Sequence, residues 1–198
     1  MPKFIRYLLA ALILGALLFA LGPRPQFAPL DPQPDPRRWP IDEVASVVLP
    51  REAALPDLKP GNAAYFVWAD STAPTDYALV YLHGFSASPR EGGPLHERFA
   101  DHYGYNLYLP RLPGHGLAGP DAFAGPEAKD WVDAAKEAVA IGKSIGRRVI
   151  LMATSTGATL ALYLAAADPD IAALILMAPN IDLYSSSSRL LNGPWGRP

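Results

Sequence analysis

The sequence contains no cysteine, and this absence excludes disulfide bonds, thiolate metal sites and cysteine lipidation. It also lacks an excess of either charge. The net charge of −2 gives no basic surplus that would point to nucleic acid, and there is no acidic tail. Half of the residues are hydrophobic, which is typical of a globular domain. We expect neither a cofactor nor a metal ion, and the composition leaves the oligomeric state open.

The first 22 residues are typical of a membrane segment. Lys3 and Arg6 precede an uncharged run, rich in Leu and Ala, from Tyr7 to Leu21. Its length falls between the roughly 20 residues of a membrane span and the about 7–15 of a signal-peptide core. We expect an uncleaved anchor or a signal cleaved near Gly22; a buried core helix is a weaker alternative, because the run has no polar face. The leading positive charges place the N-terminus inside, so the domain is periplasmic or extracellular, or secreted after cleavage.

Proline is abundant, with 22 residues, and much of it lies between Pro23 and Pro40. Repeated proline blocks the backbone hydrogen bonds of helices and sheets and favours extended polyproline geometry. We therefore expect residues 23–40 to form a semi-rigid spacer that holds the following domain off the membrane.

From residue 41 onward, apolar runs of strand length alternate with helical patterns. The runs are continuous rather than alternating, which predicts strands buried on both faces, as in a parallel sheet. The order of elements predicts a doubly wound, mostly parallel α/β fold. The predicted strands are Val44–Leu49, Ala63–Trp68, Ala78–Leu82, Asn106–Leu109, Val149–Met152 and Ile171–Met177, and the predicted helices are Pro94–Tyr103, Asp130–Ile145 and Thr156–Ala167.

Details of two helices follow from residue spacing. Leu95, Phe99 and His102 fall at helical spacing in the first helix, and we expect both His96 and His102 on its surface. Asp130 is expected to cap the N-terminus of the second helix, with Gly146 following its C-terminus.

The segment Ala153-Thr154-Ser155-Thr156-Gly157 joins a predicted strand to a predicted helix. A tight strand-to-helix turn with a central serine is the arrangement of the nucleophile elbow. The positions two before and two after the serine must be small, and here they are Ala153 and Gly157. The pattern predicts that Ser155 is a nucleophile for acyl transfer. The alternative is an ordinary helix N-cap, a common place for serine.

Two upstream segments strengthen the first interpretation. His83-Gly84-Phe85 and Leu112-Pro113-Gly114-His115-Gly116 each follow a predicted strand. With the elbow, they resemble, in the same order, motifs of the α/β-hydrolase superfamily, within the branch of esterases, lipases and serine aminopeptidase-like enzymes that includes monoacylglycerol lipases. The likeness extends from Tyr65 to Leu183. It implies a serine hydrolase acting on a carboxylic ester of a small molecule or lipid; a peptidase or amidase is a related alternative.

The resemblance also implies the surroundings of the nucleophile. The oxyanion of the tetrahedral intermediate needs two N–H donors, which we expect from the backbone of Phe85 and Thr156. His83 is expected to be a buried histidine that shapes the oxyanion loop, and His115 to stabilise its turn rather than to act in catalysis.

One half of the family pattern is missing. The family places the acid and the histidine base after the nucleophile, whereas all four histidines, at positions 83, 96, 102 and 115, precede Ser155. Asp182 is a weak candidate for the acid. We therefore interpret residues 41–183 as the N-terminal part of the hydrolase domain and residues 184–198 as the opening of a truncated cap.

Three explanations compete for the missing histidine. The favoured one is that the chain is a fragment of a longer enzyme, so that the 198 residues alone are inactive. The second is a complete but non-catalytic binding module, tethered to the membrane. The third is a base from His115 or from another subunit.

Overall fold

The computed structural model describes residues 2–24, 26, 28–182 and 193–196. The chain divides into two compact units, a larger one spanning Leu30–Ile181 and a smaller one formed by the two ends of the chain, Met1–Pro29 and Asp182–Pro198. The predicted cap segment, residues 184–198, lies largely outside the described residues.

The smaller unit contains helix α1 (Lys3–Ala20), none of whose residues is buried. Its 18 residues have a mean hydropathy of 1.9, so the helix is long and apolar enough to cross a membrane. A signal sequence near the N-terminus meets the same criterion. The predicted N-terminal apolar helix is therefore confirmed, whereas its relation to a membrane remains a prediction.

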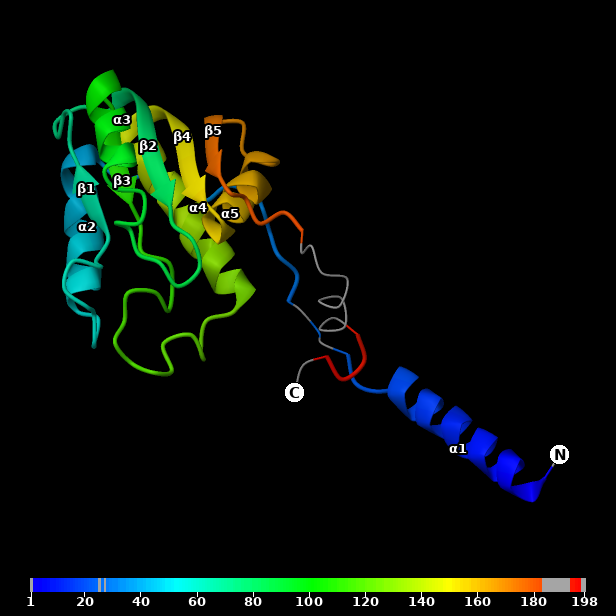
Figure 1. The fold of residues 1–198 in the computed structure, drawn as a ribbon. Helices are drawn as coiled ribbons and strands as arrows, with labels where there is room; N and C mark the ends of the chain where they lie inside the picture. Colours follow the sequence, from blue (N-terminus) through cyan, green and yellow to red (C-terminus); the bar gives the residue numbers. More distant parts are fainter. Residues whose placement is uncertain (1, 25, 27, 183–192, 197–198) are drawn as a thin grey trace. The chain divides into compact units, whose positions relative to one another are not determined.

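The larger unit is built on a five-stranded sheet in the order β1-β3-β2-β4-β5 (Figure 1). Only β1 runs antiparallel, against β3, and all other neighbours are parallel. The predicted mostly parallel sheet is confirmed. Its strands are β1 (Tyr65–Val67), β2 (Thr75–Leu82), β3 (Asn106–Leu109), β4 (Gly146–Thr154) and β5 (Ile171–Met177).

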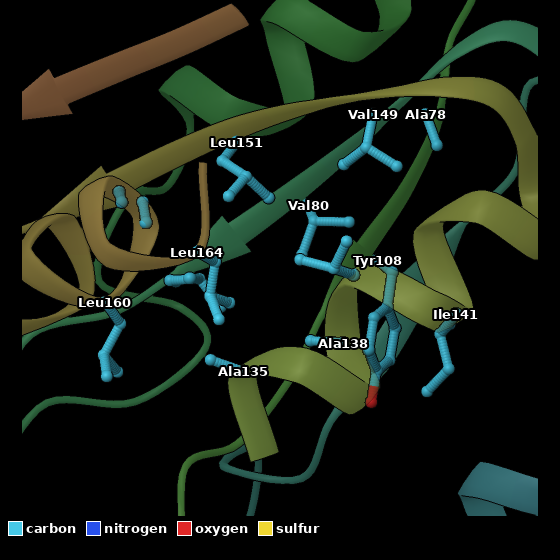
Figure 2. Packing of buried hydrophobic residues seen from close by; sticks show 14 of the residues in the cluster. Ala78, Val80, Tyr108, Ala135, Ala138, Ile141, Val149, Leu151, Leu160 and Leu164 are labelled. Atoms are coloured by element: carbon cyan, nitrogen blue, oxygen red, sulfur yellow. The ribbon is translucent and has the colours of Figure 1, made fainter. Parts of the chain in front are cut away.

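Helices cover both faces of this sheet, as a doubly wound fold requires. One face packs on α2 (Ile41–Ala53), α4 (Ala128–Ile145) and α5 (Thr156–Ala165). Figure 2 shows Val80 and Leu151 of the central strands beside Ala138 of α4 and Leu164 of α5. The other face packs on α3 (Leu95–Tyr103) through a second apolar cluster.

Successive residues of the central strands enter opposite clusters. Val80 and Leu82 belong to the first cluster, whereas Leu79 and Tyr81 belong to the second. Side chains of a strand point alternately to its two faces, so a strand covered on both faces needs an unbroken apolar run. This is why the continuous apolar runs of β2, β3 and β4 predict these strands correctly.

The predicted strand at Val44–Leu49 is wrong, because these residues lie in helix α2. Val44 and Val48 are both buried, and a spacing of four residues places them on one helical face. Pro40 precedes the helix and Asp42 and Glu43 occupy its first turn, where acidic residues favour the helix dipole. Packing against the core thus overrides the strand preference of valine.

The residues at helical spacing in α3 mark its buried face only in part, because Phe99 alone of the three packs on the second cluster. His96 and Ala100 are its buried residues, whereas Leu95 is 49% exposed and His102 is exposed. The His96 ring lies 4.8 Å from the Tyr81 ring, so it packs on the second cluster. His96 is therefore not a surface residue, and only His102 meets that expectation.

Helix α4 begins two residues before the predicted start. Its N-cap is Glu127, and Asp130 is the N3 residue of a capping box rather than the cap itself. The Asp130 carboxylate accepts a hydrogen bond from the Glu127 N–H at 2.8 Å. Gly146 follows the helix in extended conformation and opens β4 directly.

The second half of the proline-rich segment belongs to the larger unit. Trp39 packs against the first cluster, and its N–H donates to Ser144 Oγ at 3.1 Å. The Lys136 ammonium pairs with the Asp31 carboxylate at 3.2 Å. These contacts attach residues 31–39 to α4. The boundaries predicted for the linker and the hydrolase domain stay predictions.

Candidate active site

Ser155 occupies a sharp turn between β4 and α5. Its backbone has φ 50° and ψ −116°, a conformation that residues with a Cβ rarely adopt. The turn is fixed by hydrogen bonds at both ends, because the Ser155 N–H donates to Met177 O at 3.0 Å and the Ser155 carbonyl accepts from the Thr159 N–H at 3.1 Å. This is the local geometry that the elbow pattern predicts.

Crowding around the turn explains its small residues. A Cβ atom on Gly157 would lie 2.6 Å from the carbonyl oxygen of His83, and Ala153 is fully buried. A Cβ atom on Gly84 would lie 3.3 Å from Ser155 Cβ. The loop after β2 therefore touches the elbow, and glycine makes this close approach sterically possible.

The geometry differs from that of an ordinary N-cap. Ser155 holds the N-cap position before α5, but its side chain makes no capping hydrogen bond. An ordinary N-cap has an extended backbone and caps with its side-chain oxygen. Within the described part of the chain, the Ser155 hydroxyl has no hydrogen-bond partner.

Of the two expected oxyanion donors, Thr156 is the chain neighbour of Ser155, and Phe85 is the chain neighbour of Gly84, which approaches Ser155 in space. Thr156 follows Ser155 at the first turn of α5, where N–H groups have no partner within the helix. Phe85 follows Gly84, whose approach to Ser155 is described above. Among the described residues, neither the Phe85 nor the Thr156 N–H donates a hydrogen bond. Their role in catalysis stays a prediction.

His83 joins the two upstream loops. Its Nε2 accepts a hydrogen bond from the Leu112 N–H at 3.0 Å, so the proton lies on Nδ1, which contacts Gly84 O at 2.9 Å. Burial lowers the pKa of His83 to about 4, which keeps the ring neutral at physiological pH. The expectation that His83 is buried and contacts the loop after β2 is confirmed, whereas the oxyanion role of this loop stays a prediction.

His115 is buried and contacts three aromatic rings. Together they form what we call the aromatic patch, which consists of Phe85, His115, Phe123 and Trp131. Its Nδ1 donates to Pro113 O at 3.0 Å, and Trp131 Nε1 donates to the same oxygen at 3.0 Å. The Phe85 ring lies 4.9 Å from the Phe123 ring and is 53% exposed. Burial lowers the pKa of His115 as well. The aromatic patch thus offers apolar surface next to the oxyanion loop.

Comparison with known proteins identifies the family. The model of the alpha/beta hydrolase family matches residues 79–198, which is more than half of the chain. The chain belongs to the α/β-hydrolase family. The match begins within β2 and includes both upstream loops and the elbow.

Two relatives of this α/β-hydrolase are esterolytic enzymes by name. A thermostable monoacylglycerol lipase of Bacillus sp. (strain H-257) is 31% identical over 115 residues, which cover 58% of this chain and 45% of the lipase. A pimeloyl-[acyl-carrier protein] methyl ester esterase of Xanthomonas campestris pv. campestris is 35% identical over 103 residues, covering 51% and 36%. The matched segment thus spans less than half of either relative.

A solved structure described for LipS and LipT, two metagenome-derived lipolytic enzymes, matches with a TM-score of 0.60 at 24% identity. It covers 71% of this chain and 55% of the other. At this identity the likeness shows a shared fold.

Two further histidines pack outside the loops that surround Ser155. His96 packs under Tyr81, and His102 is exposed with its ring 4.7 Å from that of Tyr103. Asp182 belongs to the smaller unit. In the described ranges no histidine is hydrogen-bonded to Ser155, and no group of three or more His, Cys, Asp or Glu side chains is placed to hold a metal ion.

Sequence reasoning missed Glu91, which contacts the loop after β2. Its Oε2 accepts hydrogen bonds from the Gly84 N–H at 2.8 Å and from the Tyr81 hydroxyl at 3.0 Å. Glu91 lies in an irregular loop between β2 and α3, so no periodic pattern marks it. Only the three-dimensional structure brings it to Gly84.

Proposed function

We propose that the full protein is a serine hydrolase that cleaves a carboxylic ester through an acyl-enzyme on Ser155. The observation that supports this most directly is the strained elbow, which presents an unpaired hydroxyl beside two unpaired N–H donors, of Phe85 and Thr156. Strained backbone conformations are costly, and they cluster at sites where the strain serves function.

The chemistry follows from this arrangement. Ser155 Oγ attacks the ester carbonyl carbon as its proton passes to a base, and the carbonyl oxygen becomes an oxyanion held by the two N–H groups. Collapse of the intermediate expels the alcohol, which takes the proton from the base, and leaves the acyl group on Ser155. Water then attacks the acyl carbon and gives a proton to the base, the acid is released, and the base returns the proton to Ser155 Oγ. Each donor contributes on the order of 10²–10³ to kcat in related sites.

The base of this reaction does not come from His83 or His96. Both ring nitrogens of His83 are engaged in hydrogen bonds, and burial lowers its pKa to about 4, which makes the ring a poor proton acceptor. His96 lies under Tyr81, on the face of the sheet covered by α3. We place the base in sequence outside the 198-residue chain, and the acid there too, with Asp182 as the weaker candidate for the acid within the chain. The chain alone is therefore expected to be inactive.

The proposed substrate is an acylglycerol or a similar lipid ester. The two relatives named above act on a monoacylglycerol and on a methyl ester, according to their names. The aromatic patch next to the oxyanion loop supplies apolar surface for an acyl chain, because burying apolar area there is favourable. Helix α1 supports a position at a membrane, with the domain outside the cytoplasm.

A fluorophosphonate probe tests the nucleophile. Wild-type full-length protein should be labelled at Ser155, identified by peptide mass, and Ser155→Ala should not be labelled. Ser71→Ala, which changes an exposed loop serine, is the matched control and should label like the wild type. A folded, full-length wild type that does not react would overturn the proposal and favour the non-catalytic binding module.

A second assay tests the source of the base. The 198-residue chain should hydrolyse p-nitrophenyl esters at the rate of its Ser155→Ala variant. Robust hydrolysis by the chain that His115→Ala abolishes would show that the base was assigned wrongly.

A further inference from the structure

We propose that Glu91 is a positioning residue, whose carboxylate holds the oxyanion loop against the nucleophile elbow. This inference rests on the proposed serine hydrolase function and concerns the same site. It assigns to Glu91 the task of aiming the Phe85 N–H.

A chain of hydrogen bonds connects the loop that contains Phe85 with the strand that leads into the elbow. Glu91 Oε2 accepts from the Gly84 N–H and from the Tyr81 hydroxyl. The Tyr81 oxygen lies 3.0 Å from Thr154 Oγ1. Because the Tyr81 proton is directed to Glu91, the Thr154 hydroxyl donates to Tyr81. Gly84 directly precedes Phe85, and Thr154 directly precedes Ser155, so the chain ends one residue from each catalytic position.

Both backbone groups of Gly84 are thereby fixed. Its N–H is held by Glu91, and its carbonyl contacts His83 Nδ1 at 2.9 Å and accepts from the Ala87 N–H at 3.3 Å. The Gly84 carbonyl and the Phe85 N–H belong to one planar peptide unit. Fixing the two dihedral angles of Gly84 therefore fixes the direction of the Phe85 N–H. Glycine has unusual conformational freedom, so this position needs such a restraint.

The carboxylate also lies close to the reacting serine. A Cβ atom on Gly84 would be 3.2 Å from Glu91 Oε1 and 3.3 Å from Ser155 Cβ. A negative charge near a developing oxyanion is unfavourable by Coulomb's law. The acceptor geometry and the charge of Glu91 therefore have opposite effects on the reaction. Substitutions that change one without the other can separate them.

Glu91→Ala removes the acceptor and the charge, whereas Glu91→Gln removes the charge and keeps an acceptor oxygen. A positioning role predicts that Gln restores what Ala loses. Thr154→Val breaks the chain at its other end without changing the size of the side chain. Glu97→Ala is the matched control, because the Glu97 carboxylate accepts a hydrogen bond from the Tyr65 hydroxyl at 3.1 Å and has no contact with Gly84 in the described structure.

The experiment compares these variants in the full-length protein with p-nitrophenyl butyrate. Rates are expressed per active site, counted by fluorophosphonate titration, so that a loss of folded protein does not appear as a loss of kcat. Oxyanion donors act on the transition state, so kcat should fall while KM stays nearly constant. We expect kcat to fall by about 10- to 100-fold in Glu91→Ala, by about 3- to 10-fold in Thr154→Val and by less than about 3-fold in Glu91→Gln and Glu97→Ala.

The possible failures are distinguishable. A wild type that the fluorophosphonate does not label overturns the proposed function, and this inference with it. A labelled wild type for which Glu91→Ala and Glu97→Ala have the same kcat overturns this inference alone. So does a Glu91→Gln variant that loses as much kcat as Glu91→Ala. If Glu91→Ala does not fold, an unchanged kcat in Thr154→Val overturns the inference.

Discussion

A Cβ atom on Gly157 would lie 2.1 Å from the carbonyl oxygen of Leu82. The elbow after β4 therefore packs directly on the end of β2. The parallel register pairs Leu82 with Ala153, so both strands end at the same level of the sheet. Two loops that are distant in the sequence are thereby brought together, one with Phe85 and the other with Ser155.

This contact predicts a large effect of Gly157→Ala. The added methyl group meets backbone atoms that cannot rotate away, so we expect the free energy of unfolding to fall by ~3 kcal/mol or more. Urea denaturation measures this change. Gly125→Ala is the matched control, because a Cβ there has no neighbour within 4 Å, and it should shift the stability by less than ~1 kcal/mol. Equal stability of the two variants would contradict the observed packing.

Burial of His83 predicts a pH dependence of stability. Histidine in the unfolded chain takes up a proton below about pH 6.5, whereas folded His83 stays neutral down to about pH 4. The unfolded state binds more protons in this window, so the free energy of unfolding falls as the pH is lowered. The contribution of His83 is on the order of 3 kcal/mol.

Urea titrations between pH 7 and pH 4 measure this slope. Burial lowers the pKa of His96 and His115 too, so these residues add to the slope of the wild type. His83→Gln should reduce the slope by about one proton, with the exposed His102→Gln as the control for loss of a histidine. A slope unchanged in His83→Gln would be inconsistent with a neutral, buried ring.

The proposed donors act through backbone N–H groups, which predicts contrasting effects at Phe85. Phe85→Ala keeps the N–H, so kcat for a short ester should fall by less than about 10-fold, whereas Phe85→Pro removes the donor and should lower kcat by about 10²–10³. Loss of the ring should also raise KM for an octanoate more than for a butyrate, because the aromatic patch loses apolar surface. Equal losses of kcat in both variants would argue against the backbone donor.

Helix α1 predicts membrane association. The protein should remain in the membrane pellet after an alkaline carbonate wash, and deletion of residues 2–22 should release it. Leu12→Arg places a charge in the middle of the helix and should impair insertion, at a cost of about 2.5–3.5 kcal/mol. The mass of the mature N-terminus distinguishes an anchor, which keeps Met1 or Pro2, from a cleaved signal. Full solubility of the uncleaved wild type would contradict the proposed anchor.

The strands of the sheet could be predicted from the sequence, but not every helix could. Strands β2, β3 and β4 are covered on both faces, so their apolar runs are unbroken and unambiguous. Residues 44–49 form a short run with three valines, for which periodicity does not separate a strand from a helix turned toward the core. The predicted surface position of His96 is wrong for a similar reason, because the spacing within α3 does not show which of its faces meets Tyr81 of β2.

Part of the candidate site could also be predicted from the sequence, and part could not. Ser155, Gly157 and the loop glycines lie in short contiguous motifs, each with a local steric reason, and such motifs are readable in one dimension. Glu91 reaches Gly84 across a loop without a repeating pattern, so its contact depends on tertiary structure alone.

The positive φ of Ser155 lowers the stability of the folded protein, whereas its side chain is required for the proposed hydrolysis. Glycine adopts positive φ without steric cost, so Ser155→Gly should relieve the elbow and yield a protein more stable than the wild type. A selection for thermostability alone would then enrich variants that have lost the proposed nucleophile. Engineering of this protein therefore needs activity as a second criterion from the first round, because heat resistance and hydrolysis make opposite demands on one residue.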